Sequence, residues 1–288
     1  EITIGDWSSD VCSSDLSLLH VSPEFNWEVE NPPTNELVYC ASSIGLNSPV
    51  LFHHFLQLAL RSHTRTIALT SSSSYEDIAS VCKRNGLNVE AAIQDGSLLL
   101  LPVEMVESEY INQADAIQSI ASPDGTTQTL PLYQPRAYPV PTCSLSNVFS
   151  TCVAKLTQLH SQVDSVCLLV DDVLVLGDSN ASVLSSVRTL RNMLEDHFTN
   201  YLFVVAHPCG LDSNLALYHS LVHLSDVQML LMPLATGASN AVHGSLVVHR
   251  SVVGGVFRSV TLRRHVKIGD NGIRLFVPGE IGRASCRE

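Results

Sequence analysis

The sequence is poor in charge, in aromatic rings and in long apolar runs. Only 15% of its 288 residues are charged and 6% are aromatic, whereas 45% are hydrophobic. This apolar content suffices for a packed core and excludes a wholly disordered chain. Basic side chains number 16 against 28 acidic ones, and the net charge of −12 argues against a surface-wide attraction to nucleic acid or anionic lipid. No apolar run approaches the roughly 18 residues that a membrane span needs.

The eight cysteines are scattered, and no C-x-x-C pair occurs among them. No segment resembles a secretory signal peptide. In a chain of this length, both features indicate reduced thiols in an intracellular protein, and neither a disulfide framework nor a structural zinc site is expected.

The two ends of the chain read differently from its middle. Residues 6–16 (DWSSDVCSSDL) and 280–288 (EIGRASCRE) look like translations of the oligonucleotide adapters used to build sequencing libraries. We therefore interpret residues 1–16 and 280–288 as adapter-derived artefacts and exclude them from the fold. The alternative is that both are genuine flexible termini. Without these flanks, 22 acidic and 14 basic side chains remain, and the net charge becomes −8.

Short apolar runs alternate with helical patterns through the rest of the chain. This alternation predicts one α/β domain over residues 17–279, with a mostly parallel sheet covered by helices on both faces. Four runs separated by glycine turns predict antiparallel hairpins at the carboxyl end. The expected parallel strands are 36–42, 65–70, 98–103, 165–170, 201–206 and 227–232, and those of the hairpins are 244–249, 256–262, 265–268 and 273–277.

Helix signals lie between these strands. Pro49 suits the first position of a helix, and Ser74 with Asp77 forms a plausible capping box for a helix that ends near Arg84. Further helices are expected over 145–162, 180–197 and 212–223. The proline-rich stretch 104–142 predicts a long excursion from the domain.

The strand, loop and helix over residues 36–62 occupy the position where a phosphate-binding loop would lie. Such a loop needs glycines, whose backbone N–H groups surround the phosphates, and a lysine that reaches the terminal phosphates. Here the loop carries one glycine, Gly45, together with Asn47 and Ser48, and no lysine precedes it. Pro49 also removes one N–H group from the start of the helix. The loop therefore predicts a degenerate nucleotide site without hydrolysis.

Asp171 and Asp172 follow an apolar strand, in the arrangement in which an acidic residue holds magnesium in nucleotide hydrolases. Because the partner lysine is missing, we favour a relic or a structural role for both. No G-x-S-x-G elbow and no H-E-x-x-H pattern occurs. We therefore expect no catalytic residues, no metal site and no cofactor.

Basic residues concentrate near the carboxyl end. Six of the 14 basic side chains lie within 25 positions, with Asp270 as the one acidic residue among them. They are either a ridge for RNA phosphates or charges that protect an edge hairpin from mispairing. The six residues are Arg250, Arg258, Arg263, Arg264, Lys267 and Arg274.

Four segments together resemble the sixth subunit of the Elongator complex. They occur in the family's order and span almost all of the chain between the flanks. This resemblance implies a RecA-like fold without working Walker motifs, in agreement with the loop at 43–48. The segments are VLFHHFLQLALRS at 50–62, VCLLVDD at 166–172, LATGASNAVHGSL at 234–246 and HVKIGDNGIRLFVPG at 265–279.

The resemblance also implies partners. The protein would be a non-catalytic subunit, not an enzyme, in a hetero-hexameric ring with Elongator subunits four and five. That ring is accessory to the remaining Elongator subunits, which modify the wobble uridine of certain tRNAs, and it would bind tRNA. The resemblance implies a cytoplasmic protein, and a location in both the cytoplasm and the nucleus is the alternative. By analogy with RecA-like rings, partners would lie against residues 43–48, Asp171 and Asp172, with Thr236, Gly237 and His243 on a further loop at that side.

Two alternatives stay open. One is a nucleotide-binding RecA-class ATPase or regulator with a nonstandard phosphate loop, which the missing lysine disfavours. The other is a small-molecule enzyme that uses the crevice above a doubly wound sheet, which the missing nucleophile and cofactor motifs disfavour.

The interpretation of the two ends predicts that clean full-length reads of the transcript lack the codons of residues 6–16 and 280–288. The physical basis is that these residues match adapter sequence in one frame each. Re-sequencing of the transcript is the measurement. Recurrence of the DWSSDVCSSDL codons in such reads would show that the segment is genuine.

Overall fold

The structure is a computed structural model, and it describes the central part of the chain. The described residues are 33–43, 46, 49–104, 143–144, 147–208, 210–234, 242–250, 260–269 and 272–276. Most of the predicted excursion at 104–142 and both predicted foreign ends lie outside these residues.

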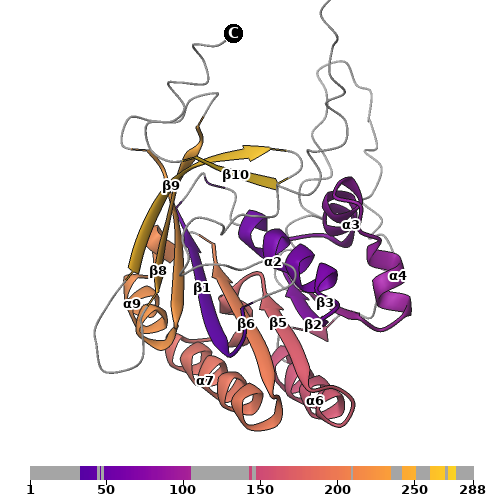
Figure 1. Ribbon diagram of the computed structural model, residues 1–288. Helices are drawn as coiled ribbons and strands as arrows, with labels where there is room; N and C mark the ends of the chain where they lie inside the picture. The colour runs from indigo at the N-terminus through magenta and orange to yellow at the C-terminus, as the bar shows by residue number, and fades with distance from the viewer. Residues whose placement is uncertain are drawn as a thin grey trace, which may run out of the picture.

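Helices and strands alternate along the first part of the described chain, and four strands close it (Figure 1). The first half contains β1 (Glu36–Ser42), α2 (Pro49–Arg61), β2 (Arg65–Thr70), α3 (Tyr75–Arg84), α4 (Val89–Gln94), β3 (Leu98–Glu104), β4 (Cys143–Ser144) and α6 (Val148–His160). The second half contains β5 (Ser165–Val170), the 3₁₀ helix η3 (Val173–Leu176), α7 (Asn180–His197), β6 (Asn200–His207), α8 (Gly210–Ser213), α9 (Leu215–Leu224), β7 (Val227–Met232), β8 (Gly244–Arg250), β9 (Val260–Gly269) and β10 (Gly272–Phe276).

The ten strands of the described residues belong to one sheet. Their order is β10-β9-β8-β7-β1-β6-β5-β2-β3-β4. The strands from β7 to β4 in this order pair in parallel, and β8, β9 and β10 extend the sheet in antiparallel pairs. The predicted α/β class is confirmed: a mostly parallel sheet flanked by helices, with antiparallel strands at its carboxyl end.

Alternate residues of the central strands pack into two apolar cores, one on each face of the sheet. In β1, Val38 and Cys40 join the core under α2, whereas Leu37 and Tyr39 join the core under the helices of the opposite face. Both cores consist mainly of valine and leucine, as expected for parallel strands that are buried on both sides. The first core is completed by α2, α3 and α4, and the second by α6, α7 and α9.

Cysteines in these cores are structural. The four cysteines whose side chains are described are all free and buried: Cys40, Cys82, Cys152 and Cys167. Burial raises the pKa of the Cys82 thiol to about 12, and that of Cys167 is raised as well. Such thiols pack as small hydrophobic groups and are poor nucleophiles.

The predicted helices differ from the observed ones in two places. The expected helix over 212–223 is divided into α8 and α9, because the Asn214 side chain accepts a hydrogen bond from Leu217 N and starts a new helix there. The short helix α4 was not expected from the sequence. Its start is capped by Asn88, whose side chain accepts from Ala91 N.

The carboxyl-terminal strands also differ from the prediction. Two strands were expected over 256–262 and 265–268, with a break between them, but β9 runs without interruption through Arg263 and Arg264. The two arginines point to opposite faces of this one strand, and both keep their backbone pairing with β8. The expected hairpin to β10 is present, with Gly269 paired to Gly272.

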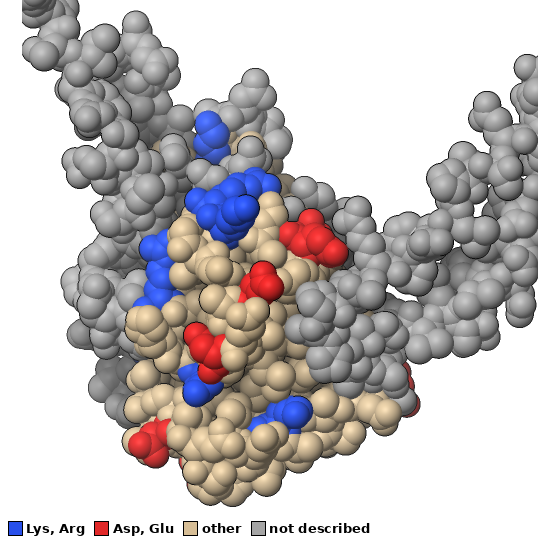
Figure 2. Space-filling model, turned by 90° about the vertical axis from the view of Figure 1, so that its right-hand side faces the viewer, with Lys and Arg blue, Asp and Glu red and all other residues tan. Residues whose placement is uncertain are grey.

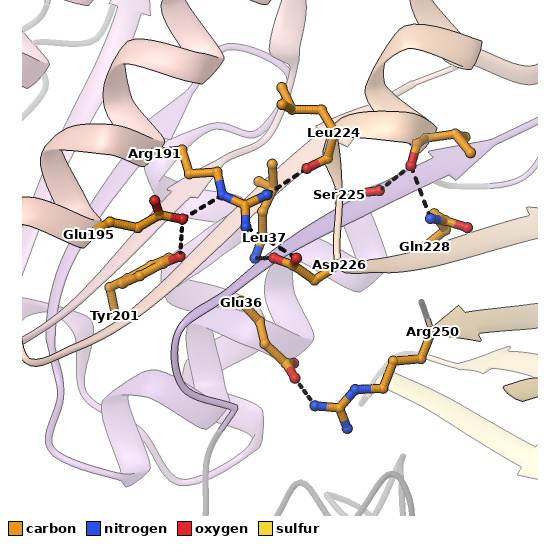
Figure 3. Close-up of polar contacts among 11 residues, drawn as sticks. Glu36, Leu37, Arg191, Glu195, Tyr201, Leu224, Ser225, Asp226, Gln228 and Arg250 are labelled. Atoms are coloured by element: carbon orange, nitrogen blue, oxygen red, sulfur yellow. Dashed lines mark hydrogen bonds and ion pairs between the residues drawn. The ribbon is translucent and has the colours of Figure 1, made fainter. Parts of the chain in front are cut away.

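A polar network ties the helices of the second face to the sheet (Figure 3). The Arg191 guanidinium on α7 donates to Glu195 at 2.7 Å, to the Leu224 carbonyl at 2.6 Å and to Asp226 at 3.1 Å. Asp226 in turn accepts from Leu37 N at 2.7 Å. Charge-assisted bonds of this kind are stronger than neutral ones. One arginine therefore joins α7, the end of α9 and the start of β1.

Candidate functional site

The parallel strands end at one edge of the sheet, which we call the carboxyl edge. The described residues at the ends of β1, β2, β5 and β6 are Ser42 and Ser43, Thr70 to Ser74, Asp171 and Asp172, and His207. In open α/β sheets, ligands and partners bind at this edge. The predicted degenerate nucleotide site lies here.

Asp171 is the most heavily bonded side chain of the carboxyl edge. The residue is 1% exposed, and its carboxylate faces the loop that follows β2. The backbone N–H groups of Ser71, Ser72 and Ser73 donate to it at 2.8–3.1 Å. The hydroxyl groups of Ser71 and Ser72 donate as well, at 3.1 and 2.9 Å. Three successive N–H groups form the kind of nest that binds anions, and here the anion is a side chain of the protein itself.

The serine loop carries α3 directly after this nest. Ser74 caps the helix, since its hydroxyl oxygen accepts from Asp77 N at 3.1 Å, as the sequence predicted. The Ser74 hydroxyl in turn donates a hydrogen bond to the Asp77 carboxylate, with an O···O distance of 2.8 Å. Asp171 therefore fixes the exit from β2 and the start of α3, and its carboxylate has no free side for a metal ion in this arrangement.

Asp172 has a different environment from its neighbour. Its carboxylate accepts from Leu174 N at 3.0 Å and caps the 3₁₀ helix η3. Burial raises the pKa of Asp172 to about 6, and the charge of Asp171 adds to this effect. Both aspartates thus accept hydrogen bonds from the backbone of the chain itself, Asp171 from the serine loop and Asp172 from η3.

His207 ends β6 and is fully buried against Tyr39 of β1. The Tyr39 hydroxyl lies 2.9 Å from His207 Nδ1. Burial lowers the pKa of His207 to about 4 and raises the pKa of Tyr39, so both groups are neutral at physiological pH. One of the two neutral groups donates to the other, and the tautomer of the His207 ring sets the direction of this hydrogen bond. A side chain on Gly210 would collide with this ring, at 2.5 Å from Nδ1.

Several buried polar atoms of the carboxyl edge have no hydrogen-bond partner among the described residues. They are Ser42 Oγ, Thr70 Oγ1, Ser73 Oγ and His207 Nε2. The described residues named above, at the carboxyl ends of β1, β2, β5 and β6, include no lysine or arginine. The edge is therefore polar but carries no positive side chain there that would neutralise phosphate.

His243 lies near the same edge, at the start of β8. Its backbone N donates to the Val266 carbonyl at 2.8 Å, and its Nδ1 accepts from Ile268 N at 3.0 Å. Three strands, β7, β1 and β6, separate it from the strand that leads to Asp171. The loop after β1 reaches this region, because a side chain on Gly244 would lie 3.2 Å from the Leu46 side chain. The other predicted residues lie outside the described part: Gly45, Asn47, Ser48, Thr236 and Gly237.

The structure divides the predicted basic ridge between the two faces of the sheet. Arg263 and Lys267 are exposed on one face. Arg264 lies on the other face, opposite Leu246 of the first core, and donates to the Arg263 carbonyl at 3.0 Å. Arg250 forms an ion pair with the buried Glu36 of β1 (Figure 3). Arg258 lies outside the described residues.

The backbone register pairs two basic positions, Lys267 of β9 and Arg274 of β10. The Lys267 side chain is exposed on the same face as Arg263. These two exposed cations of β9 fit a surface that an anion covers, and they fit equally a charged strand that resists mispairing.

Sequence reasoning missed most of the contacts described above. It identified Asp171 but not its serine partners, which are about a hundred residues distant in the chain. The four successive serines at Ser71–Ser74 were a signal, because such a run supplies many donors. It also missed His207 and Tyr39, since nothing in either local pattern marks them as a pair.

The two aspartates predict opposite effects on stability. Asp171→Asn should lower the free energy of unfolding by about 2–4 kcal/mol, because an amide nitrogen would face N–H donors that are already buried. Asp172→Asn should raise it by about 1–2 kcal/mol above pH 6, because it removes a partly buried charge but keeps the cap. Since the pKa of Asp172 is raised to about 6, the folded state favours the protonated carboxyl. The free energy of unfolding of the wild type therefore falls as the pH rises from about 4 to about 6.

Chemical denaturation of both variants at several pH values measures these effects. The gain of Asp172→Asn should vanish below about pH 4, where the wild-type carboxyl is protonated in both states. An Asp171→Asn protein as stable as wild type would contradict the role of the serine loop.

The described residues contain no group of three or more His, Cys, Asp or Glu residues that could hold a metal ion. None of their helices is long and apolar enough to cross a membrane.

Comparison with known proteins gives one family. No curated protein matches the chain. The family model described as Elongation complex protein 6 matches residues 17–261, which is most of the chain. The chain therefore belongs to the Elongation complex protein 6 family, a family of Elongator complex subunits.

Proposed function

We propose that this protein is a non-catalytic subunit of the accessory hetero-hexameric ring of Elongator. In that ring it stands beside Elongator subunits four and five, and it supports tRNA binding and wobble-uridine modification by the complex. Family membership over residues 17–261 carries the proposal. The remaining Elongator subunits hold the chemistry.

The carboxyl edge supports a role without nucleotide hydrolysis. A magnesium-binding acid must offer a free carboxylate oxygen, whereas the Asp171 carboxylate accepts from three serine N–H groups and two serine hydroxyls. The protein uses this acid to order its own loop. A second argument is that the described residues at the carboxyl ends of β1, β2, β5 and β6 include no lysine or arginine, because phosphate binding needs positive charge or free N–H donors.

One observation keeps the alternative function open, in which the protein is a nucleotide-binding RecA-class ATPase or regulator. Four buried polar atoms at this edge lack partners among the described residues, and they could hydrogen-bond to a ligand: Ser42 Oγ, Thr70 Oγ1, Ser73 Oγ and His207 Nε2. Equilibrium binding of ATP and ADP to the isolated chain distinguishes the two functions. Saturable binding that Ser42→Ala weakens would favour the regulator.

Assembly is the direct test of the proposed function. Co-expressed with subunits four and five, the chain should purify in one complex whose native mass equals two copies of each subunit. The physical reason is that ring subunits bury their contact faces only against each other. A soluble monomer that ignores both partners would rule the proposal out.

The basic face of β9 predicts a contribution to tRNA binding by the assembled ring. Arg263→Glu with Lys267→Glu should weaken tRNA affinity about tenfold or more, because each lost phosphate contact also removes released counterions. The slope of log affinity against log salt should fall by about one unit for each charge.

Arg264→Glu is the matched control, because Arg264 lies on the opposite face of the same strand. It should change affinity much less than the double variant. If the double variant keeps both the affinity and the salt slope, these charges only guard the sheet edge.

A further inference from the structure

Strand β9 has a neighbouring strand on both sides along only part of its length. Its residues 260–266 pair with β8, whereas β10 pairs with residues 265–269 only. In the part of the chain that the structure describes, no strand lies along the second side of residues 260–263. We call this stretch the open edge of β9.

Two positions of the open edge, Thr261 and Arg263, direct their backbone N–H and C=O groups away from β8. The hairpin between β9 and β10 closes on the pair of Gly269 and Gly272, and such a closing pair exchanges hydrogen bonds. Because the pattern alternates along an antiparallel strand, every second residue from Gly269 back to His265 directs its backbone groups towards β10. Arg263 and Thr261 continue the same series. A row of such groups is a template for a further strand.

The Arg263 carbonyl shows what a neighbouring strand would supply. It accepts a hydrogen bond from the Arg264 guanidinium at 3.0 Å, so a side chain takes the place of a backbone N–H donor. A direct continuation of β10 could not provide that donor. Phe276 pairs with His265, so the continued register would bring Pro278 opposite Arg263. Proline has no N–H group.

Leu262 leaves the first core incompletely covered at the open edge. It is half-buried and packs against this core on the face of the sheet under α2. Val266 lies on the same face of β9 and is fully buried, and there β8 and β10 flank the strand on both sides. A strand beside Leu262 would likewise remove more apolar surface from water, which favours its binding.

The charge of β9 has one sign. Its ten residues include Arg263, Arg264 and Lys267 but no aspartate or glutamate. Arg263 and Lys267 are exposed on one face. Opposite charges on neighbouring strands attract each other, whereas like charges repel. The open edge therefore fits a strand with one apolar and one acidic face.

The other end of the sheet gives an acidic strand no such preference. Figure 2 shows this side of the molecule, on which α3 and α4 lie, and there blue and red side chains are interspersed among uncharged ones. Helix α3 alone contributes both signs, with Glu76 and Asp77 in its first turn and Lys83 and Arg84 in its last. Mixed charge of this kind is typical of a solvated surface.

Residues 24–30 of this chain have the composition that the open edge requires. Their sequence, EFNWEVE, alternates polar with apolar side chains, as a half-buried strand does. The apolar set is Phe25, Trp27 and Val29, and the polar set includes three glutamates. These residues lie outside the described part of the chain. So do residues 251–259 next to β9, but they contain one arginine and no acidic residue and lack the complementary charge.

The path of the chain lets this segment reach the open edge. The chain enters β1 at Glu36, which forms an ion pair with Arg250 of β8, and Arg250 is the register partner of Val260 at the start of β9. A strand beyond β9 lies four strand spacings from β1, which is about 19 Å. The extended chain from Glu28 to Glu36 spans up to about 26 Å. Residues 29–35 are therefore long enough to connect the two.

We infer that residues 24–28 form a further strand along the open edge, antiparallel to β9. Trp27 lies beside Leu262 and extends the first core. This register brings Glu28 diagonally next to Arg263 on the exposed face. The direction follows from the connection, because residue 28 lies nearer than residue 24 to the end of the sheet where β1 and β9 start. The segment completes the sheet and supplies acidic charge to its basic strand.

A disulfide in the full chain tests the pairing directly. Trp27→Cys with Leu262→Cys places two thiols on a pair that does not exchange hydrogen bonds, where side chains come closest. Under mild oxidation this variant should cross-link within one chain at least about tenfold faster than Trp27→Cys with Leu215→Cys, because pairing raises the effective concentration of the thiols. Leu215 suits the control because it is exposed at the start of α9. Intact mass without reductant distinguishes a cross-link within one chain from one between two chains.

Hydrogen exchange measures whether the open edge is bonded. The amides of Thr261 and Arg263 should exchange at least about tenfold faster in Trp27→Ser than in wild type. Glu28→Lys should act in the same direction, and Arg263→Glu added to Glu28→Lys should restore slow exchange, because the charge pair is then only reversed. Asp196→Lys, at an exposed position of α7, is the charge control and should change neither amide. If Trp27→Ser does not fold, the loss and recovery of slow exchange in the two charge variants decide in its place.

Three outcomes overturn the inference, and they can be told apart. Amides that exchange as fast in wild type as in the variants, without a cross-link, would leave the open edge without a strand from this chain. A cross-link between two chains would assign the strand to a second copy. Slow exchange that needs subunits four and five and survives the change of Trp27 would assign the open edge to a strand of a partner.

Discussion

A buried carboxylate must be satisfied by donors from the protein, and the carboxyl edge of this sheet is built around that requirement at Asp171. An unpaired charge at 1% exposure would cost several kcal/mol. The serine loop after β2 supplies the donors, so its path and the start of α3 are set by one side chain of β5. The same bonds occupy the acid that lies where a nucleotide hydrolase would hold magnesium, which supports the proposed non-catalytic role.

The Arg191 network plays the corresponding part at the other end of the strands. Its bonds to Leu224 and Asp226, and the bond from Leu37 to Asp226, hold α7, α9 and β1 together where the strands begin. Between these two polar ends the sheet is held by valine and leucine on both faces. A scaffold fixed in this way can present its outer surfaces rigidly, as the proposed role in a ring requires.

The parallel part of the sheet and its antiparallel extension present different surfaces, because the sheet continues beyond the strands that helices cover. Helices cover both faces of the parallel strands, whereas β9 presents Arg263 and Lys267 on an exposed face. These two basic residues lie at one side of the sheet, away from the aspartates that follow β5. The net charge of −12 conceals this exposed pair of basic residues.

The α/β class, most strand positions and the family were all accessible from the sequence, because buried parallel strands are continuous apolar runs and the matching segments occur in order. The residue types and their positions in the sequence also identified Asp171, Asp172 and the basic residues as candidate functional residues. Only the tertiary structure decided what each of them does. Hydrogen bonds across a hundred residues pair Asp171 with the serine loop, and strand register separates Arg263 from Arg264 although they are neighbours in the chain. Local patterns determine which elements form, but contacts between distant segments decide which side chains remain free to bind.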